Sequence, residues 1–568
     1  MEQTKRIDRF HTPLAESLLL ENNFFDLYPF DGGGYFITQA QLKASDDEAI
    51  YRAVLLENAM AEFGTLPALD FTKFERWSTI EKTSWLNRLY FLPPLAKTAD
   101  LKQDDATAAL VKDTILYFHR NYPPPSGREA VCAMTRRVIE SRDRDYNSGN
   151  LDGETEYIWF DFQPASRIVN TINAMRFLRH STVISEVEWA EFDEFIRVHA
   201  ETLYLDEKYA CKLAPGNHQA LRGLALLYGA AYFAGEHFAA EWAREGERIC
   251  NYHMVHDYLA DGTLIDISPS YHIFETWINR DAMKLADAYG FKISGEARRM
   301  QARSHELCRI FRQPDGGSVV IDDGYSLNMD VFLQTIDAPG ETACTARLTA
   351  SKMAFYRDER FFVMLDASPN VGKYSHFHGG KNAVALWFGG KPFCVDSACC
   401  NYDDIEFAEW FKQPQAHSGL FIDGIGDSIL QGRYSWLTAA QTELSEWRGH
   451  AIESRLTSGV PQWQGVEWLR RVDVSNRVTL LDEVSAAAEH DLTFIFNLHP
   501  DVQIELEQEQ IILTNGGVRA ILQWECPAAV EWTLRDGLVF WNREKRPSTQ
   551  LAASIRGAST TFKTIWSC

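Results

Sequence analysis

Two histidines stand one residue apart in KYSHFHGGKN, residues 373–382, and form the single His-x-His motif of the sequence. An imidazole can act as a general base or bind a metal, so His376 and His378 can be two bases, two ligands, or one of each. Further on, Asp396 ends the run KPFCVD and His417 lies in QAHSGLFIDG. With His378, these residues offer the nitrogen and oxygen ligands that zinc accepts. The alternative is that Asp396 ends a strand in a turn and His417 lies on the surface.

Two earlier segments carry a second set of candidates. Asn217 and His218 stand in APGNHQALRG, and LADGTLIDISPSYH ends in Tyr271 and His272. At a helix start, the Asn217 amide can donate to a carboxylate, helped by the positive end of the helix dipole, or it can simply cap the helix. Tyr271 can donate a proton, and it can accept one when neighbouring cations lower its pKa. Taken without further context, a Tyr-His pair after a proline turn is more often a packed aromatic.

The elements that must position these residues change character along the chain. From about residue 45 to 330, apolar residues recur at helical spacing, interrupted at loop-forming stretches such as NYPPPSGRE and RQPDGGS. After about residue 340, short alternating runs such as ERFFVMLDAS and LTFIFNL indicate antiparallel strands. Helices followed by strands are typical of segregated domains. We predict an α+β multidomain protein, with a helical domain at 1–335 and an antiparallel β domain at 336–568.

Composition excludes several classes of protein. The 568 residues are 45% hydrophobic and 24% charged, which is typical of a globular chain. A net charge of −23 argues against broad binding to nucleic acid or to an anionic membrane. The ten cysteines form no C-x-x-C pair and are expected to be mostly reduced thiols. We find no apolar run of the ~18 residues that a transmembrane helix needs. No signal peptide is recognised, so we expect a cytoplasmic protein, or a periplasmic or secreted one if a signal was trimmed.

The motifs together resemble the heparinase II/III-like polysaccharide lyases. The stretch HFHGGKNAVALWFGGKPFCVD, followed by QAHSGLFIDG, is similar to the β-domain signature of that family, and the Asn-His and Tyr-His segments match its helical domain in the expected order. The sequence departs from the pattern at Gly380, where Asp is frequent, and at Asp266, where Glu is usual. The resemblance implies an (α/α) toroid followed by an antiparallel β-sandwich.

The resemblance also implies a chemistry. A lyase of this kind removes the C5 proton of a uronic acid and expels the C4 oxygen, so it needs a carboxylate neutraliser, a base and an acid. Asn217 matches the neutraliser, Tyr271 the proton-transferring tyrosine, and His376 a second base. His378 is then a metal ligand, together with Asp396 and His417. The expected divalent metal is a structural zinc that positions the loop of His376. His218 is expected to be a further catalytic residue. The residues expected to bind substrate are Arg167, Arg222 and His272.

The expected substrate is an anionic polysaccharide or its oligosaccharides, and glycosaminoglycans such as heparan sulfate, hyaluronan or chondroitin sulfate are favoured over alginate because Asn217-His218 resembles the heparinase-type neutraliser. The sequence leaves the oligomeric state open. A glycoside hydrolase would need two carboxylates, for which Asp161 and Glu275 are candidates. A cupin-like oxygenase is disfavoured because Asn382 stands where that motif needs Glu. A non-catalytic polysaccharide-binding protein would tolerate the loss of Tyr271 or His376, and both are present.

Overall fold

The chain folds into two compact units. The structure, a computed structural model, describes Phe10 and residues 64–72, 87–145, 157–336, 343–371, 376–399, 404–541 and 544–568. Unit 1 comprises Met1–Tyr258 and Phe274–Ala302, and unit 2 comprises Leu259–Ile273 and Arg303–Cys568.

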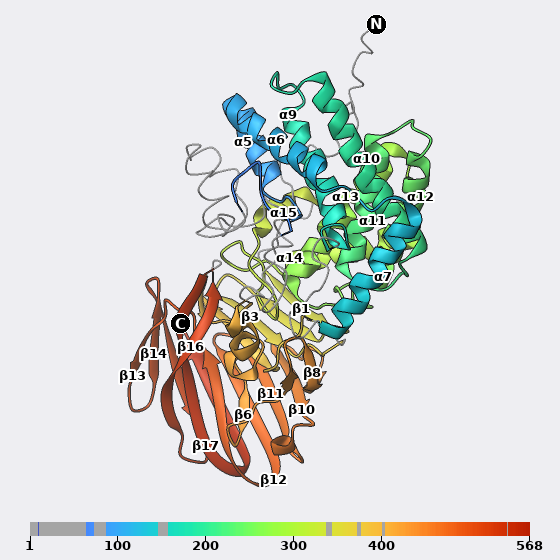
Figure 1. Ribbon diagram of the computed structural model, residues 1–568. Helices are drawn as coiled ribbons and strands as arrows, with labels where there is room; N and C mark the ends of the chain where they lie inside the picture. Colours follow the sequence, from blue (N-terminus) through green and yellow to red (C-terminus); the bar gives the residue numbers. More distant parts are fainter. Residues whose placement is uncertain are drawn as a thin grey trace, which may run out of the picture. The chain divides into compact units, whose positions relative to one another are not determined.

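Unit 1 is helical throughout its described part (Figure 1). Its helices, with α13 and α14 continuing into unit 2, are α5 (Leu92–Lys102), α6 (Asp105–Asn121), α7 (Gly127–Asp145), α9 (Phe162–Leu178), α10 (Glu186–Tyr209), α11 (Asn217–Tyr232), α12 (Ala239–His256), α13 (Pro269–Tyr289) and α14 (Gly295–Ile310). Sixteen of the 17 residues of α9 are buried, so this helix is surrounded by protein on every side. Polar groups on such a helix must find partners inside the protein.

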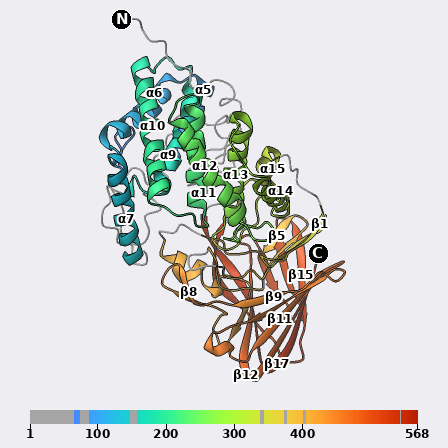
Figure 2. The same cartoon turned by 90° about the vertical axis from the view of Figure 1, so that its right-hand side faces the viewer.

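Helices α11 and α12 lie side by side (Figures 1 and 2) and approach closely at two glycines. A Cβ on Gly223 would lie 2.7 Å from Ile249 Cγ2, and one on Gly246 would lie 2.9 Å from Leu227 Cδ2. Any larger residue at either position would push the helices apart. This close packing fixes the axis of α11, whose first residue is Asn217.

Unit 2 contains two antiparallel sheets. The five-stranded sheet has the order β1-β2-β3-β4-β5, with strands Cys344–Leu348, Met353–Arg357, Phe361–Asp366, Ala383–Phe388 and Lys391–Cys394. The larger sheet has the order β13-β14-β15-β17-β12-β11-β10-β9, with β16 paired to β17 and β6 to β12. Its strands are β6 (Leu420–Ile422), β9 (Gln441–Leu444), β10 (Ala451–Thr457), β11 (Glu467–Val474), β12 (Val478–Asn497), β13 (Gln503–Leu506), β14 (Ile511–Asn515), β15 (Val518–Glu525), β16 (Glu531–Trp541) and β17 (Glu544–Ser567). The small hairpin β7 (Ile429–Gln431) and β8 (Ser435–Thr438) stands apart from both sheets.

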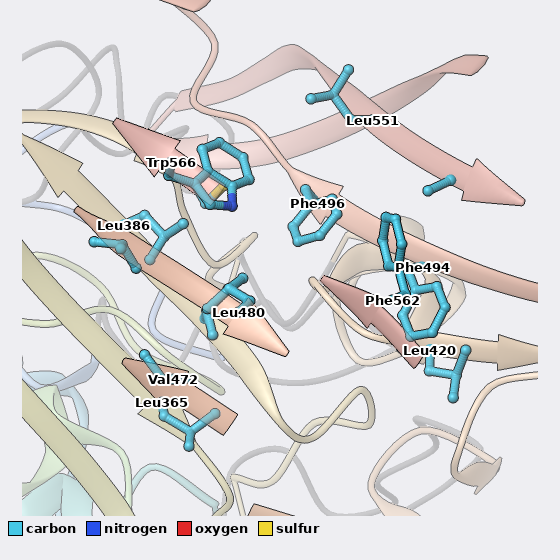
Figure 3. Close-up of a cluster of buried hydrophobic side chains, with 14 of the residues drawn as sticks. Leu365, Leu386, Leu420, Val472, Leu480, Phe494, Phe496, Leu551, Phe562 and Trp566 are labelled. Carbon is cyan, nitrogen blue, oxygen red and sulfur yellow. The ribbon is translucent and has the colours of Figure 1, made fainter. Parts of the chain in front are cut away.

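One hydrophobic core joins the two sheets into a sandwich. Alternate residues of β3, such as Val363 and Leu365, pack in the same cluster as Leu480 of β12 and Trp566 of β17 (Figure 3). Strand β11 alternates between buried and half-buried residues, as a strand with one covered face should. Strands β3 and β4 are buried along their whole length, which means that both of their faces are covered.

The second face of the five-stranded sheet is covered by segments from the first part of unit 2. Phe362 and Met364 of β3 share a core cluster with Ile267, Phe311 and Ile321. These covering segments, 259–273 and 303–336, include the first turn of α13 and also α15 (Met329–Thr335). They carry Tyr271 into the same compact unit as the histidines that precede β4.

The predicted fold class, helices followed by an antiparallel sandwich, is confirmed. The predicted boundary at 335/336 differs from the division into units, because residues 259–273 and 303–335 bury their apolar side chains against the five-stranded sheet. Much of the N-terminal segment that a closed (α/α) toroid would include lies outside the described residues. Within the described part, no helix combines the length and the apolar character needed to cross a bilayer.

Candidate active site

Tyr271 and His376 stack on one another in unit 2. Their ring centroids lie 3.7 Å apart and their planes differ by 20°. Tyr271 lies in the first turn of α13, and His376 lies seven residues before β4. Both side chains are partly exposed, so both are accessible to a ligand. The structure therefore brings together two predicted proton-transfer residues that are far apart in the sequence.

Asp266 is the carboxylate next to this pair. Its Oδ1 lies 3.5 Å from Nδ1 of His376, and both side chains are about one-fifth exposed. Burial opposes protonation of His376, but the charge of Asp266, with a smaller contribution from Asp323, outweighs it and raises the pKa of His376 above its ordinary value. The shorter Asp266, where the family pattern has Glu, still reaches the histidine.

The segment that carries His376 and His378 is anchored to the turn at Asp322 and Asp323. The carbonyl of His376 accepts from Asp323 N at 3.2 Å, and the backbone N of His378 donates to Asp322 Oδ1 at 2.9 Å. Buried Lys381 donates to Asp322 Oδ1 and to Asp366 Oδ2, at 2.8 Å each. Burial raises the pKa of Asp322 to about 6, although the adjacent Lys381 opposes this. These contacts fix the backbone on which His376 stands.

The three predicted metal ligands are close together but engaged in hydrogen bonds. The rings of His378 and His417 are 5.4 Å apart. His417 uses Nδ1 on Asp396 Oδ2 at 2.8 Å and Nε2 on the carbonyl of Phe411 at 2.9 Å. Both partners accept only, so both ring nitrogens must donate, and the ring then has no lone pair for a metal. The raised pKa of His417, caused by Asp396 against the opposing effect of burial, agrees with this.

His378 differs from His417, because one of its two ring nitrogens makes no hydrogen bond among the described residues. Its Nε2 lies 2.6 Å from Asp323 Oδ1, whereas its buried Nδ1 has no hydrogen-bond partner among the described residues. Burial lowers the pKa of His378 to about 4, which keeps the ring neutral. A buried cation, Lys412, lies 3.6 Å from the same Asp323 oxygen. Of the two predicted histidine ligands, His378 thus has an open lone pair and His417 has none. In the described part of the chain, no group of three or more His, Cys, Asp or Glu side chains is arranged to hold a metal.

Zinc binding by His378, Asp396 and His417 therefore stays a prediction from the sequence, and the arrangement described does not fit it. If these hydrogen bonds persist in solution, protein purified without added metal should contain no stoichiometric zinc, and chelation should leave its melting temperature unchanged. Elemental analysis and a thermal melt with a chelator measure both. About one bound zinc per chain, with destabilisation on chelation, would instead support the sequence prediction and require His417 to release one of its partners.

In unit 1, Asn217 is the first residue of α11, and the N-cap position belongs to Gly216, whose φ is 151°. Asn217 is therefore not the helix cap. The residue is 7% exposed, and within the described part of the chain its side-chain amide makes no hydrogen bond. An amide without such a partner, at a helix N-terminus where backbone N–H groups carry positive potential, suits an anionic ligand.

The turn before Asn217 and His218 is held in place by a buried aspartate, Asp257. Asp257 Oδ2 accepts from Gly216 N at 3.1 Å and from His253 Nδ1 at 2.7 Å, and both side chains are completely buried. His218 itself is 47% exposed, and its Nδ1 lies 2.8 Å from Asp161 Oδ2. The start of α11 thus presents two adjacent side chains, an amide and an imidazole, on a rigid base.

Arg167 corrects one prediction of substrate binding. The residue is completely buried in α9, and its guanidinium donates to His199 Nε2 at 2.8 Å and to the carbonyls of Asn87 and Ile158 at 3.0 and 2.6 Å. The same group packs over the rings of Phe118 and Trp159. No part of it is accessible to a ligand, so Arg167 holds unit 1 together.

This role predicts the effect of Arg167→Lys. An ammonium cannot replace three diverging donors, and leaving buried acceptors unpaired should lower the free energy of unfolding by about 3 kcal/mol or more. The activity of the folded fraction should not change. Denaturant unfolding measures the loss, and Arg120→Lys is the matched control, because Arg120 is 55% exposed in its ion pair with Glu191 and should cost less than about 1 kcal/mol. A raised KM without loss of stability would contradict the assignment.

Arg222 and His272 are corrected for the same reason. Arg222 is buried, contacts Asp206 and Glu207 directly, and lies 3.5 Å from Asp161 Oδ1. His272 is completely buried, accepts at Nδ1 from Leu264 N at 3.1 Å, and lies with Nε2 3.1 Å from the carbonyl of Ser304. Burial lowers its pKa to about 4. Neither side chain is available to bind substrate.

The hydrolase alternative loses one of its two carboxylates, because Glu275 is completely buried. Asp161, by contrast, contacts a candidate site residue that the sequence had singled out. The contacts of Asp161 with His218, and those of Asp323 with His378, were not predicted. The only sequence signals for them were an acidic residue before a helical stretch, in FDFQPASR, and an Asp-Asp-Gly turn, in VIDDGYS.

Comparison with known proteins matches both the helical and the β part of the chain to one family. The family described as heparinase II/III N-terminus matches residues 47–302, and that described as heparinase II/III-like, C-terminal matches residues 341–567. The chain belongs to the heparinase II/III family. The first match ends, and the second begins, on either side of the segment 303–340.

Individual relatives are distant. A heparin-sulfate lyase of Bacteroides stercoris is 23% identical over 158 residues, which is 27% of this chain and 23% of that protein. The matched part thus spans about a quarter of that relative. A solved structure of heparinase III superimposes with a TM-score of 0.69 at 15% identity, over 88% of this chain and 79% of that one. A heparan sulfate lyase structure from Pedobacter heparinus gives 0.60 at 14% identity, over 97% and 86%. These structures establish that this member of the heparinase II/III family shares their fold.

Proposed function

We propose that this protein is a polysaccharide lyase that cleaves uronic-acid-containing polysaccharides or oligosaccharides by β-elimination. The observation that carries the proposal is the stacked pair of Tyr271 and His376, with Asp266 beside the imidazole. A phenol and an imidazole in contact, both accessible, supply the acid and the base that removal of the C5 proton and departure of the C4 oxygen require. No metal step is needed for this chemistry.

Asn217 of unit 1 is the candidate for the third requirement, the group that neutralises the carboxylate. An amide that donates to the substrate carboxylate disperses the negative charge that develops when C5 loses its proton, and this lowers the barrier to proton removal. The helix N-terminus adds positive potential without adding a titratable group. Support comes from the position of Asn217 as the first residue of α11 and from its side-chain amide, which has no hydrogen-bond partner in the described part of the chain.

Glycosaminoglycans are the substrate class that we favour. The similar solved structures include a heparinase III and a heparan sulfate lyase, and the B. stercoris relative is a heparin-sulfate lyase. The net charge of −23 repels an anionic polymer, so a few cationic or hydrogen-bonding groups at the site must bind it. Binding should therefore depend on the salt concentration.

A substrate panel tests the proposal. Heparan sulfate, hyaluronan, chondroitin sulfate and alginate are each incubated with the full chain, and the ultraviolet absorbance of an unsaturated uronate is followed. Absorbance should rise with at least one glycosaminoglycan and should not rise with the Tyr271→Phe variant. Product from alginate alone would support an oligoalginate lyase, and cleavage without absorbance would indicate hydrolysis.

A further inference from the structure

The turn before α9 has an unusual backbone at Asp161. Gln163 N donates to the carbonyl of Phe160 at 3.4 Å, which makes Asp161 the second residue of a four-residue turn. Its φ of 58° and ψ of −118° are those of a type II′ turn at this position, where glycine is strongly favoured. An L side chain is strained there, so the carboxylate of Asp161 is kept at the expense of backbone stability.

The strained turn holds the ring of His218 in place. Asp161 Oδ2 lies 2.8 Å from His218 Nδ1, and the ring of the next residue, Phe162, lies 4.7 Å from the imidazole centroid. A glycine would satisfy the backbone and lose the first of these contacts. Because a carboxylate only accepts, Nδ1 carries the proton, and in the neutral ring Nε2 carries the lone pair.

We propose that Asp161 is a positioning residue of the reaction: it fixes His218 as the Nδ1–H tautomer and so presents Nε2 as the acceptor for a hydroxyl group of the bound saccharide. This inference rests on the proposed lyase function. His218 follows Asn217 directly, it is 47% exposed, and its Nε2 has no hydrogen-bond partner among the described residues. An amide that donates to a carboxylate and an imidazole that accepts from a hydroxyl recognise different groups of one uronate.

The contact of Asp161 with Arg222 does not account for the strain. Arg222 Nη1 lies 3.5 Å from Asp161 Oδ1, but Arg222 already contacts Asp206 and Glu207, both of which are more deeply buried than Asp161. The guanidinium is therefore neutralised without Asp161. What the turn adds is a carboxylate at the imidazole.

Asp161→Gly separates backbone strain from function. Glycine accepts the turn, so the melting temperature should stay the same or rise, whereas kcat/KM on the preferred glycosaminoglycan should fall at least about tenfold. Asp161→Asn keeps the shape, but its amide can also donate, so the His218 ring loses its fixed tautomer. Nitrogen NMR of histidine-labelled full chain reports that tautomer directly, and the His218 signal is assigned by its loss in His218→Gln.

Asp206→Asn is the matched control. It removes a carboxylate from the same arginine without touching the imidazole, so it should lower the melting temperature and leave both the His218 tautomer and the KM of the folded enzyme unchanged. Asp161→Gly with unchanged kcat/KM, or Asp161→Asn with an unchanged tautomer, would overturn the inference. A wild-type chain without lyase activity would refute the proposed function alone, because the tautomer is measured without substrate.

Discussion

Tyr271→Phe should abolish unsaturated-product formation on every substrate and leave the fold intact. Phenylalanine keeps the ring that stacks on His376 at 3.7 Å between centroids and removes the hydroxyl group that carries the transferable proton. Acid–base groups typically contribute ~10²–10⁴-fold, so kcat should fall by that factor, with the melting temperature nearly unchanged. Initial rates of ultraviolet absorbance and a thermal melt are the two measurements.

His376→Ala is the companion variant, and it should discriminate between substrates. If His376 is the base for one uronate epimer and Tyr271 for the other, the alanine variant should lose far more activity on one epimer than on the other. Hyaluronan and a heparan sulfate fraction rich in iduronate provide the comparison. Losses below about tenfold for both Tyr271→Phe and His376→Ala would mean that the stacked pair is structural.

Asn217→Asp should have the second large effect, a loss of activity that greatly exceeds any loss of stability. The side chain keeps its size, but a carboxylate repels the uronate that the amide is proposed to bind, so kcat/KM should fall by about 10²–10³-fold. A negative charge in the first turn of a helix is favourable, whereas burial of a carboxylate is unfavourable, so the melting temperature should change little.

The matched control for Asn217→Asp is Ala240→Asp, which adds the same charge to the exposed first turn of α12. It should leave kcat/KM unchanged. If Asn217→Asp lowers activity only in proportion to a loss of folded protein, Asn217 supports the fold and does not bind the carboxylate.

Periodicity was sufficient to predict the fold class, because helices with one buried stripe and strands such as β11 repeat their burial pattern in the sequence. It could not place the boundary between the compact units. Segments 259–273 and 303–336 are short apolar stretches whose partner, the outer face of the five-stranded sheet, is far away in the chain. Only the folded structure shows that pairing.

For the site too, some residues could be predicted from the sequence and others only from the folded structure. Tyr271 and His376 were predicted from motif order, and the structure stacks them. Arg167 was assigned to substrate because an arginine is a frequent anion-binding residue, and its sequence neighbours carry no signal that α9 is buried on every side. The contact between Asp161 and His218 depends on a single turn conformation, which no residue pattern in FDFQPASR specifies.

The mass of the product is the most direct test of β-elimination. The full chain is incubated with size-defined oligosaccharides of whichever glycosaminoglycan it cleaves, and the new non-reducing ends are examined by mass spectrometry and NMR. The proposed function predicts fragments whose masses sum to that of the substrate, with a C4=C5 double bond in the terminal uronate. Fragments whose masses sum to that of the substrate plus one water, with a saturated end, would show hydrolysis and contradict it.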